Sequence, residues 1–286
     1  MWLFYSLLDA ISDATKDVFS KKGLGKMDEY LVAWGWRFFT FLFLVPLLFF
    51  MPIPKLDFQF WQALIISGVF GTITSVLFMR AIKLSPLSLT IPILTFTPVF
   101  LLIPSSLILK EFPNVYGFIG ILLIIFGAYL LNIQETKGTL IGPFKALIKE
   151  RGPILMLLVT FIWGITGSFD KVGVLHSSSL FWAISINFFL FLILSVIILL
   201  KRRNFKSEII PNVKTLLPMG FFAALSMSFQ MTAIKMTLVP YTTAVKQTRI
   251  IFSSLYGFLI FKEQFIKSRL LAVSIMVLGA LFITLS

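Results

Sequence analysis

Long apolar stretches separated by short polar segments run through the whole chain. A helix needs about 20 consecutive, mostly apolar residues to cross a bilayer, and the apolar stretches predict about ten such helices. The pattern therefore predicts an all-α polytopic membrane protein. We place the helices at residues 2–20, 31–51, 61–80, 87–109, 115–132, 153–174, 180–200, 213–234, 239–261 and 268–285.

Composition strengthens this prediction. Of the 286 residues, 58% are hydrophobic and 13% are charged, and the mean hydropathy is +0.97. A soluble domain averages about half apolar and about a quarter charged residues. The lack of cysteine excludes a disulfide framework and a thiolate metal site, and we expect neither a metal nor a cofactor. The N-terminal segment lacks a basic region and a cleavage motif, so we expect a mature helix there and not a signal peptide.

The two halves of the chain repeat one another. Residues 80–96, RAIKLSPLSLTIPILTF, align with residues 232–248, TAIKMTLVPYTTAVKQT, and this register continues to the C-terminus. Each half then holds five helices, and an odd number inserts the second copy upside down relative to the first. Such inverted repeats are a transporter architecture, with the substrate site near the middle of the membrane. We expect a five-helix repeat over 1–134, a basic amphipathic linker over 135–152 with an interfacial helix at 142–151, and a second repeat over 153–286.

Several local patterns carry a family resemblance. Each half ends in Lys-Glu, a short polar turn and a glycine-bearing apolar helix, as in KEFPNVYGFIGILLIIFGAYLL and KEQFIKSRLLAVSIMVLGALFI. Two further patterns belong to the same resemblance: Trp36-Arg37-Phe38 and the segment LVTFIWGITGSFDKVGV. Over essentially its whole length the chain resembles the EamA-like permeases of the drug/metabolite transporter superfamily. The resemblance implies a carrier of about ten helices whose central cavity is lined mainly by the first, third, fourth, sixth, eighth and ninth, and it implies no particular substrate.

The formal net charge of +13 bears on the partners of the protein and on its orientation in the membrane. No basic face is interleaved with exposed aromatic residues, so we expect no nucleic-acid partner. Most basic residues fall in loops on one side, which the positive-inside rule makes cytoplasmic, with both termini outside. The resemblance points the other way, because many family members are drawn with cytoplasmic termini. The basic side holds Lys21, Lys22, Lys26, Arg80, Lys83, Lys137, Lys145, Lys149, Arg151, Lys201, Arg202, Arg203, Lys206, Lys262, Lys267 and Arg269, and the other side holds Lys55, Lys110, Lys171 and Lys235.

The stretch 239–261 carries two cations inside a predicted span. As one continuous helix it places Thr242, Lys246, Arg249 and Ser253 on one narrow face, with Thr243 beside it. Cations in hydrocarbon are costly, so this face must meet protein or a water-filled cavity. We interpret it as the lining of a transport path.

The first predicted helix is the acidic counterpart. Ser6, Asp9, Asp13, Lys16, Asp17 and Ser20 cluster on one face, with Lys16 and Asp17 expected near the membrane interface. If the repeats pack around a pseudo-two-fold axis, Asp9 or Asp13 can pair with Lys246 or Arg249. Two interpretations stay open. The pairs form a static buried ion network, or the network opens and closes with substrate or proton.

Milder polar residues complete the predicted cavity. Trp163 stands where the first helix has Asp13, Thr97 stands where the ninth has Arg249, and Gln230 lies in the eighth. Four prolines at positions 86, 92, 98 and 104 predict a bent, cavity-lining fourth helix. We expect Trp34 and Trp36 to be interfacial anchors. His176, the only histidine, is expected to be structural and not a proton shuttle.

These features favour a secondary transporter that moves a small polar or amphipathic metabolite across the cell membrane by alternating access. We expect an exporter. Because no phosphate-binding loop is present for ATP, we expect a proton or exchange gradient to drive transport. Lys246 and Arg249 favour a carboxylate or phosphate substrate unless Asp9 and Asp13 neutralise them. The expected partners are the substrate and the lipid bilayer, with protons as one candidate coupling ion, and the expected state is a monomer or homodimer. A lipid-translocating or accessory subunit is the alternative. A polytopic enzyme is disfavoured, since histidine and cysteine are nearly absent.

Overall fold

The computed structural model describes residues 1–85, 90–135, 150–201, 208–261 and 268–286, and in these residues the regular structure is helical. In the first half the helices are α1 (Trp2–Leu24), α2 (Glu29–Leu44), η1 (Val45–Phe50), α3 (Phe58–Leu84), η2 (Ile91–Phe96), α5 (Thr97–Ile108) and α6 (Val115–Glu135). In the second they are α8 (Arg151–Leu175), α9 (Ser179–Leu200), η3 (Ile210–Asn212), α11 (Val213–Met236), α12 (Val239–Lys246), α13 (Arg249–Phe261) and α14 (Ser268–Thr284).

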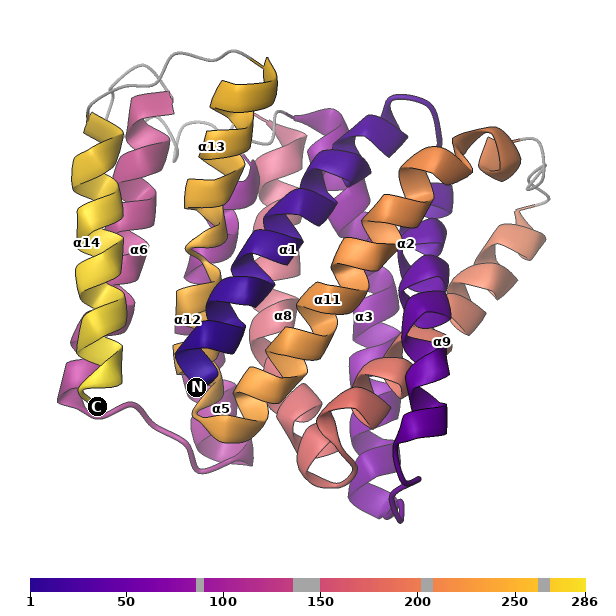
Figure 1. The fold of residues 1–286 in the computed structure, drawn as a ribbon, viewed down its shortest axis with the longest axis horizontal. Coiled ribbons are helices and arrows are strands. Elements are labelled where there is room, and N and C mark those ends of the chain that lie inside the picture. The colour runs from indigo at the N-terminus through magenta and orange to yellow at the C-terminus, as the bar shows by residue number, and fades with distance from the viewer. Residues whose placement is uncertain (86–89, 136–149, 202–207, 262–267) are drawn as a thin grey trace.

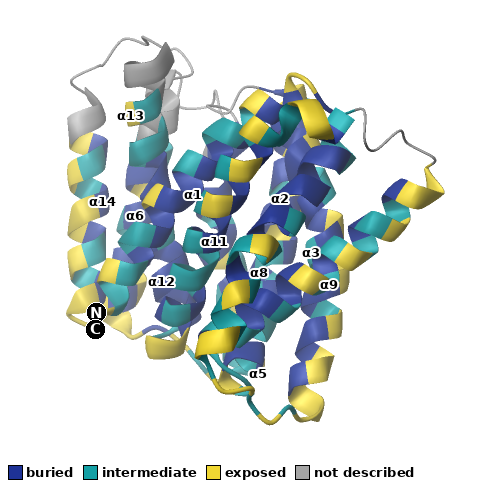
Figure 2. Cartoon of the chain, turned by 45° about the vertical axis from the view of Figure 1, so that its right-hand side comes forward, coloured by how far each residue is buried: buried dark blue, intermediate teal, exposed yellow. Residues whose placement is uncertain are grey.

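The lengths and hydropathies of these helices fit a bilayer. Among the described residues, five helical stretches are long and apolar enough to cross a membrane, and three shorter apolar helices lie at 93–108, 115–130 and 271–284. The predicted all-α polytopic class is therefore confirmed, with the count of ten spans approximate. Large apolar side chains of α6 and α14, such as Phe126 and Leu281, are exposed. Figure 2 shows exposed positions along both helices, where a bilayer would cover them.

The two halves are interwoven and do not form separate lobes. The first helix of each half packs along the third helix of the other, α1 on α11 and α8 on α3. Helices α6 and α14 form a pair at one edge, and both termini lie at the same end of the helices (Figure 1). The predicted boundaries at 134 and 153 stay a prediction. The predicted interfacial helix at 142–151 lies almost wholly outside the described residues.

Matching contacts show the internal symmetry in the polar groups. The Nζ atom of Lys171 donates to the carbonyl oxygen of Thr237 at 2.8 Å, and the Nζ atom of Lys21 donates to that of Ser85 at 3.1 Å. Residues 19–23, FSKKG, align with residues 169–173, FDKVG, so that Lys21 matches Lys171, and Ser85 matches Thr237 in the register of the later repeat. A lysine near the end of each first helix thus ties down the end of a third helix, at opposite ends of the molecule.

The ninth predicted span is not one continuous helix, and that prediction was wrong. It divides into α12 and α13 at Gln247 and Thr248, whose backbone N–H groups donate to carbonyls three residues back instead of four, at 3.0 Å each. The side chains of the same two residues donate to the carbonyls of Thr243 and Val245. Side chains that bind local carbonyls compete with regular helical bonding, which accounts for a break without glycine or proline.

The fourth predicted span is interrupted at the equivalent place. The 3₁₀ segment η2 ends at Phe96 and α5 begins at Thr97, which aligns with Arg249, the first residue of α13. Pro98 follows directly and cannot donate a backbone hydrogen bond, while the Thr97 hydroxyl donates to the Leu94 carbonyl at 2.6 Å. Interrupted helices at matching positions of two repeats are the usual setting of a transporter site.

His176 connects two helices at one end of the molecule. Its Nδ1 atom lies 2.6 Å from Asp57 Oδ2, which joins the end of α8 to the start of α3. Asp57 also accepts a hydrogen bond from the backbone N–H of Phe60 at 3.0 Å and so caps α3. This N–H bond and the neighbouring His176 lower the pKa of Asp57.

Candidate functional site

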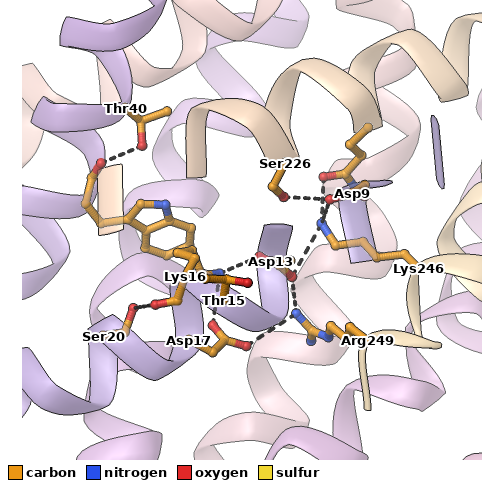
Figure 3. Close-up of polar contacts among 12 residues, drawn as sticks. Asp9, Asp13, Thr15, Lys16, Asp17, Ser20, Thr40, Ser226, Lys246 and Arg249 are labelled. Carbon is orange, nitrogen blue, oxygen red and sulfur yellow. Dashed lines mark hydrogen bonds and ion pairs between the residues drawn. The ribbon is translucent and has the colours of Figure 1, made fainter. Parts of the chain in front are cut away.

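The acidic face of α1 meets the basic residues of the α12–α13 segment in the interior of the protein (Figure 3). Lys246 Nζ lies 3.2 Å from Asp9 Oδ1 and 3.6 Å from Asp13 Oδ2. Arg249 Nη1 contacts Asp13 Oδ2 directly. The two halves of the chain are therefore joined by ion pairs between the residues that the sequence pattern placed opposite one another.

Lys16 and Asp17, which we expected near the membrane interface, belong to the same buried network. Lys16 Nζ lies 2.6 Å from Asp13 Oδ1 and 3.1 Å from Asp17 Oδ1, and Lys16 and Asp17 are each only 1% exposed. The packing of α1 along α11 carries this part of the helix into the core. The ammonium of Lys16 also lies 4.5 Å from the centre of the Trp36 ring, within cation–π range.

The network is electrically balanced, with three aspartates against three cations: Asp9, Asp13 and Asp17 against Lys16, Lys246 and Arg249. Five of these side chains are 2–6% exposed, and Lys246 is the most exposed at 14%. Burying charges costs several kcal/mol per ion unless partners compensate. The balance of charges offsets the cost of burying them. Lys246 is the member of the network that is most open to its surroundings.

Helix α11 supplies neutral partners to this network. The Ser226 hydroxyl donates to Asp9 Oδ1 at 2.5 Å, and Lys246 Nζ donates to Gln230 Oε1 at 2.9 Å. By contrast, neither carboxylate oxygen of Asp17 accepts a hydrogen bond from the described residues, and its Oδ2 lies 3.8 Å from Arg249 Nη1. Asp17 is therefore held by charge alone, and the Asp9 end of the network has the better hydrogen bonding.

A cavity of about 140 Å³ lies beside the network, lined by residues from both halves. Of the nine residues predicted from the sequence, the structure brings seven to its wall: Asp13, Lys246, Arg249, Thr243, Trp163, Thr97 and Gln230. Asp9 does not line it but contacts two residues that do, Lys246 and Ser226. Thr242 is also absent from the wall; it is 3% exposed, and its hydroxyl donates to the Val239 carbonyl at 3.0 Å.

Two charged residues on the cavity wall were missed in the sequence analysis. Arg37 projects from α2 and Asp170 from α8, and neither forms an ion pair within 4.0 Å with the described residues. Both fall inside motifs that carried the family resemblance, and a lone charge in an apolar span is itself a functional signal. That signal was available for both residues.

The tryptophans of α2 also differ from expectation, since they are not interfacial anchors. Trp36 is 7% exposed and lines the cavity, and Trp34 is 6% exposed with its indole N–H donating to Ser195 Oγ at 2.8 Å. Because α2 is enclosed by α3, α9 and α11, both rings point into protein. On another wall, the Trp163 indole donates to Thr74 Oγ1 at 3.1 Å.

The ends of the helices that enclose the cavity are tied together by Glu111. Its Oε1 atom contacts Lys171 Nζ, and its Oε2 atom accepts the backbone N–H of Val239 at 3.1 Å. One carboxylate from the first half thus holds α8 and the N-terminus of α12, where a negative charge is favourable. We call Glu111, Lys171 and Val239 the Glu111 clamp.

The comparisons agree with this architecture. A model of the EamA-like transporter family matches residues 1–133 and again residues 150–285. The chain belongs to the EamA-like transporter family. It is therefore a multi-pass membrane transporter of the drug/metabolite transporter superfamily and not an enzyme.

One solved crystal structure resembles this EamA-like transporter with a TM-score of 0.74, covering 99% of this chain and 96% of the other. The sequences are 12% identical, so this likeness shows the fold alone. No curated protein matches the sequence.

Proposed function

We propose that this transporter moves a small polar metabolite through the central cavity by alternating access, as an exporter driven by a proton or exchange gradient. The observation that carries the proposal is the balanced ion network between α1 and α12–α13, which joins the two repeats beside the cavity. Inverted repeats that rock against each other must change such a junction when the cavity opens to the other side.

The network suits this role because its pairs differ in strength. Arg249 and Asp13 are buried and in direct contact, whereas Lys246 divides its ammonium between Asp9, Asp13 and Gln230 and is partly open to the cavity. Movement of Lys246 would leave a buried carboxylate without its nearest cation. Carboxylates in apolar surroundings take up protons more readily when a neighbouring cation leaves, which offers a route to coupling with a proton gradient.

The first test is ligand-dependent stability of the purified protein. A ligand present at a hundred times its Kd stabilises the folded state by about 2.7 kcal/mol, so a panel of small anions, cations and zwitterions can be screened by thermal unfolding. Hits then enter counterflow assays in proteoliposomes with and without an imposed pH gradient. We expect wild-type protein to accumulate the hit and Lys246→Gln to lose most of this transport.

Lys83→Gln is the matched control. Lys83, like Lys246, forms an ion pair with a carboxylate, that of Glu29 at 2.7 Å, but its side chain is 39% exposed and is not part of the cavity wall. Both variants remove one ammonium. Unchanged transport in a folded Lys246→Gln protein would contradict a role for Lys246, and absence of counterflow with every stabilising ligand would contradict the transport mechanism itself.

A further inference from the structure

We propose that the cavity selects small zwitterions, with the acidic group of the ligand on Arg37 and its ammonium group on Asp170. The proposal rests on the transport function proposed above and names the substrate class for the same cavity. It comes from two opposite charges that share the wall without pairing with each other within 4.0 Å.

The guanidinium of Arg37 is held in place by neutral groups only. Its Nε and Nη2 atoms donate to Ser75 Oγ at 3.0 and 2.9 Å, and Nη1 donates to Asn187 Oδ1 at 3.2 Å. Ser75 and Asn187 are anchored in turn to backbone carbonyls of their own helices, at 2.6 and 2.8 Å. The side chain is therefore fixed in position while its charge stays uncompensated at ion-pair distance.

This anchoring leaves donors free for a ligand. A guanidinium has five N–H groups in a planar fork, and the bonds to Ser75 and Asn187 occupy three of them. One N–H on each terminal nitrogen remains. Two N–H groups of this kind match the two oxygens of a carboxylate, the bidentate arrangement that gives arginine its preference for such groups.

Asp170 supplies the opposite charge from α8. Its carboxylate lines the cavity with no cation at ion-pair distance among the residues that the structure describes. Ser67 and Trp182, which carry hydroxyl and indole N–H groups, lie next to it. An ammonium group in the cavity would give Asp170 the cation that the protein does not provide.

The other cavity charges are poor candidates for binding a ligand. Lys246 and Arg249 favour an anion only if they are not neutralised, and the network neutralises both with Asp9, Asp13 and Asp17. A ligand carboxylate at these cations would have to displace an internal one. Arg37 and Asp170 require no such displacement.

The paired charges select for a zwitterion over a simple ion. A simple anion at Arg37 leaves the Asp170 charge unpaired and a simple cation at Asp170 leaves Arg37 unpaired, whereas a zwitterion compensates both and adds no net charge to the interior. The cavity is small, at about 140 Å³. This restricts the ligand to a small one.

The test uses matched probes that differ by one charged group. Alanine, β-alanine and 4-aminobutyrate are the zwitterions, propionate lacks the ammonium group, and ethylamine lacks the acid. We expect at least one zwitterion to bind the wild type at least tenfold more tightly than propionate or ethylamine, as measured by thermal shift and calorimetry. Equal binding of the single-charge probes, or no binding of any zwitterion, would overturn the proposal.

Two variants should reverse the preference, a result that loss of structure cannot imitate. In Asp170→Asn the cavity keeps Arg37 alone, so binding should shift from the zwitterion to propionate. In Arg37→Gln it keeps Asp170 alone and should shift to ethylamine, and if that variant does not fold, Asp170→Asn decides alone. Loss of zwitterion binding in folded Asp170→Asn protein without a gain for propionate would overturn the assignment, and Lys83→Gln should retain the wild-type order.

The zwitterion assignment and the transport function can fail separately. If a zwitterion binds in an Arg37- and Asp170-dependent manner but no counterflow follows, the transport mechanism fails while the binding assignment stands. If counterflow is observed only for ligands whose binding is indifferent to both residues, transport stands and the zwitterion assignment fails.

Discussion

At the scale of single residues, the pairing of Arg249 with Asp13 should govern stability. Both side chains are at most 6% exposed and in direct contact. Replacing Arg249 by Met leaves the buried network with one excess negative charge, and breaking a buried pair in this way costs about 3–5 kcal/mol. We expect Arg249→Met to lower the thermal unfolding temperature in detergent by many degrees, as followed by circular dichroism.

The control for this experiment is again the exposed pair of Lys83 and Glu29. Exposed pairs contribute about 0–1 kcal/mol, so Lys83→Met should unfold close to the wild-type temperature. Combining Arg249→Met with Asp13→Asn restores charge balance and should recover part of the loss. If the single Arg249→Met variant is as stable as the control, the folded protein does not need Arg249 to compensate the charge of Asp13.

Single residues also show which parts of the site a sequence can and cannot predict. Asp9, Asp13, Lys246 and Arg249 could be paired in advance because acidic residues recur on one face of the first predicted helix and basic residues on one face of the ninth. Arg37 belongs to no repeating pattern of charges in its helix, and its partners Ser75 and Asn187 lie on two other helices. No periodicity in one segment reveals a site assembled from single residues of three helices.

At the scale of helices, the contact between α6 and α14 depends on glycine. A Cβ atom on Gly120 would lie 2.5 Å from the Gly279 carbonyl oxygen, and one on Gly279 would lie 2.7 Å from the Gly120 carbonyl oxygen. Backbones at this distance cannot accommodate a side chain without separating. Small residues at such contacts are typical of membrane helices.

We expect Gly120→Val to destabilise the protein by about 1–3 kcal/mol or more through overpacking. Gly25→Ala is the matched control, because a Cβ atom there meets only the Lys22 carbonyl oxygen at 3.5 Å, an ordinary contact. Thermal unfolding of both variants checks the prediction. Equal stability of the two would mean that α6 and α14 separate without cost.

The Glu111 clamp is an element-scale device because one carboxylate holds two helices. Glu111→Gln removes the charge from contacts with Lys171 and the Val239 N–H. A hydrogen bond to a charged group contributes about 1.5–3 kcal/mol, so its loss should favour opening of this end of the cavity by about tenfold or more. The absence of native cysteine makes a labelling assay clean.

In this assay, Met227→Cys places one thiol on the cavity wall, and its reaction with a maleimide is timed in detergent. Glu111→Gln should accelerate labelling, while Glu29→Gln, which breaks the exposed pair with Lys83, should not. An unchanged rate in Glu111→Gln would show that the clamp does not limit access.

At the scale of the whole molecule, the sequence predicted the helices and their duplication better than their continuity. Hydropathy and the internal repeat depend on many residues, so single errors average out. The break between α12 and α13 depends on the local hydrogen bonding of Gln247 and Thr248, two residues that also occur within regular helices. The position of Lys16 depends on how α1 packs on α11, which hydropathy does not encode.

The orientation of the protein in the membrane is also a property of the whole molecule. Both termini lie at one end of the helices, and the loop at residues 51–57 lies at that end, opposite to the loop at 25–28 that follows Lys21 and Lys22 (Figure 1). The positive-inside rule counts lysine and arginine in short loops, and the strong bias of this chain outweighs the common drawing of the family. We therefore expect both termini on the outer side of the membrane.

Two single-cysteine variants decide this orientation, and they are matched because each replaces one exposed lysine. Lys55→Cys lies at the end that holds the termini, and Lys26→Cys lies at the other end. In intact cells a membrane-impermeant maleimide should label Lys55→Cys, and it should label Lys26→Cys only after permeabilisation. The reverse pattern would place both termini in the cytoplasm. The Glu111 clamp, which shares the end with the termini, would then close the cavity against the cytoplasm and not against the outside.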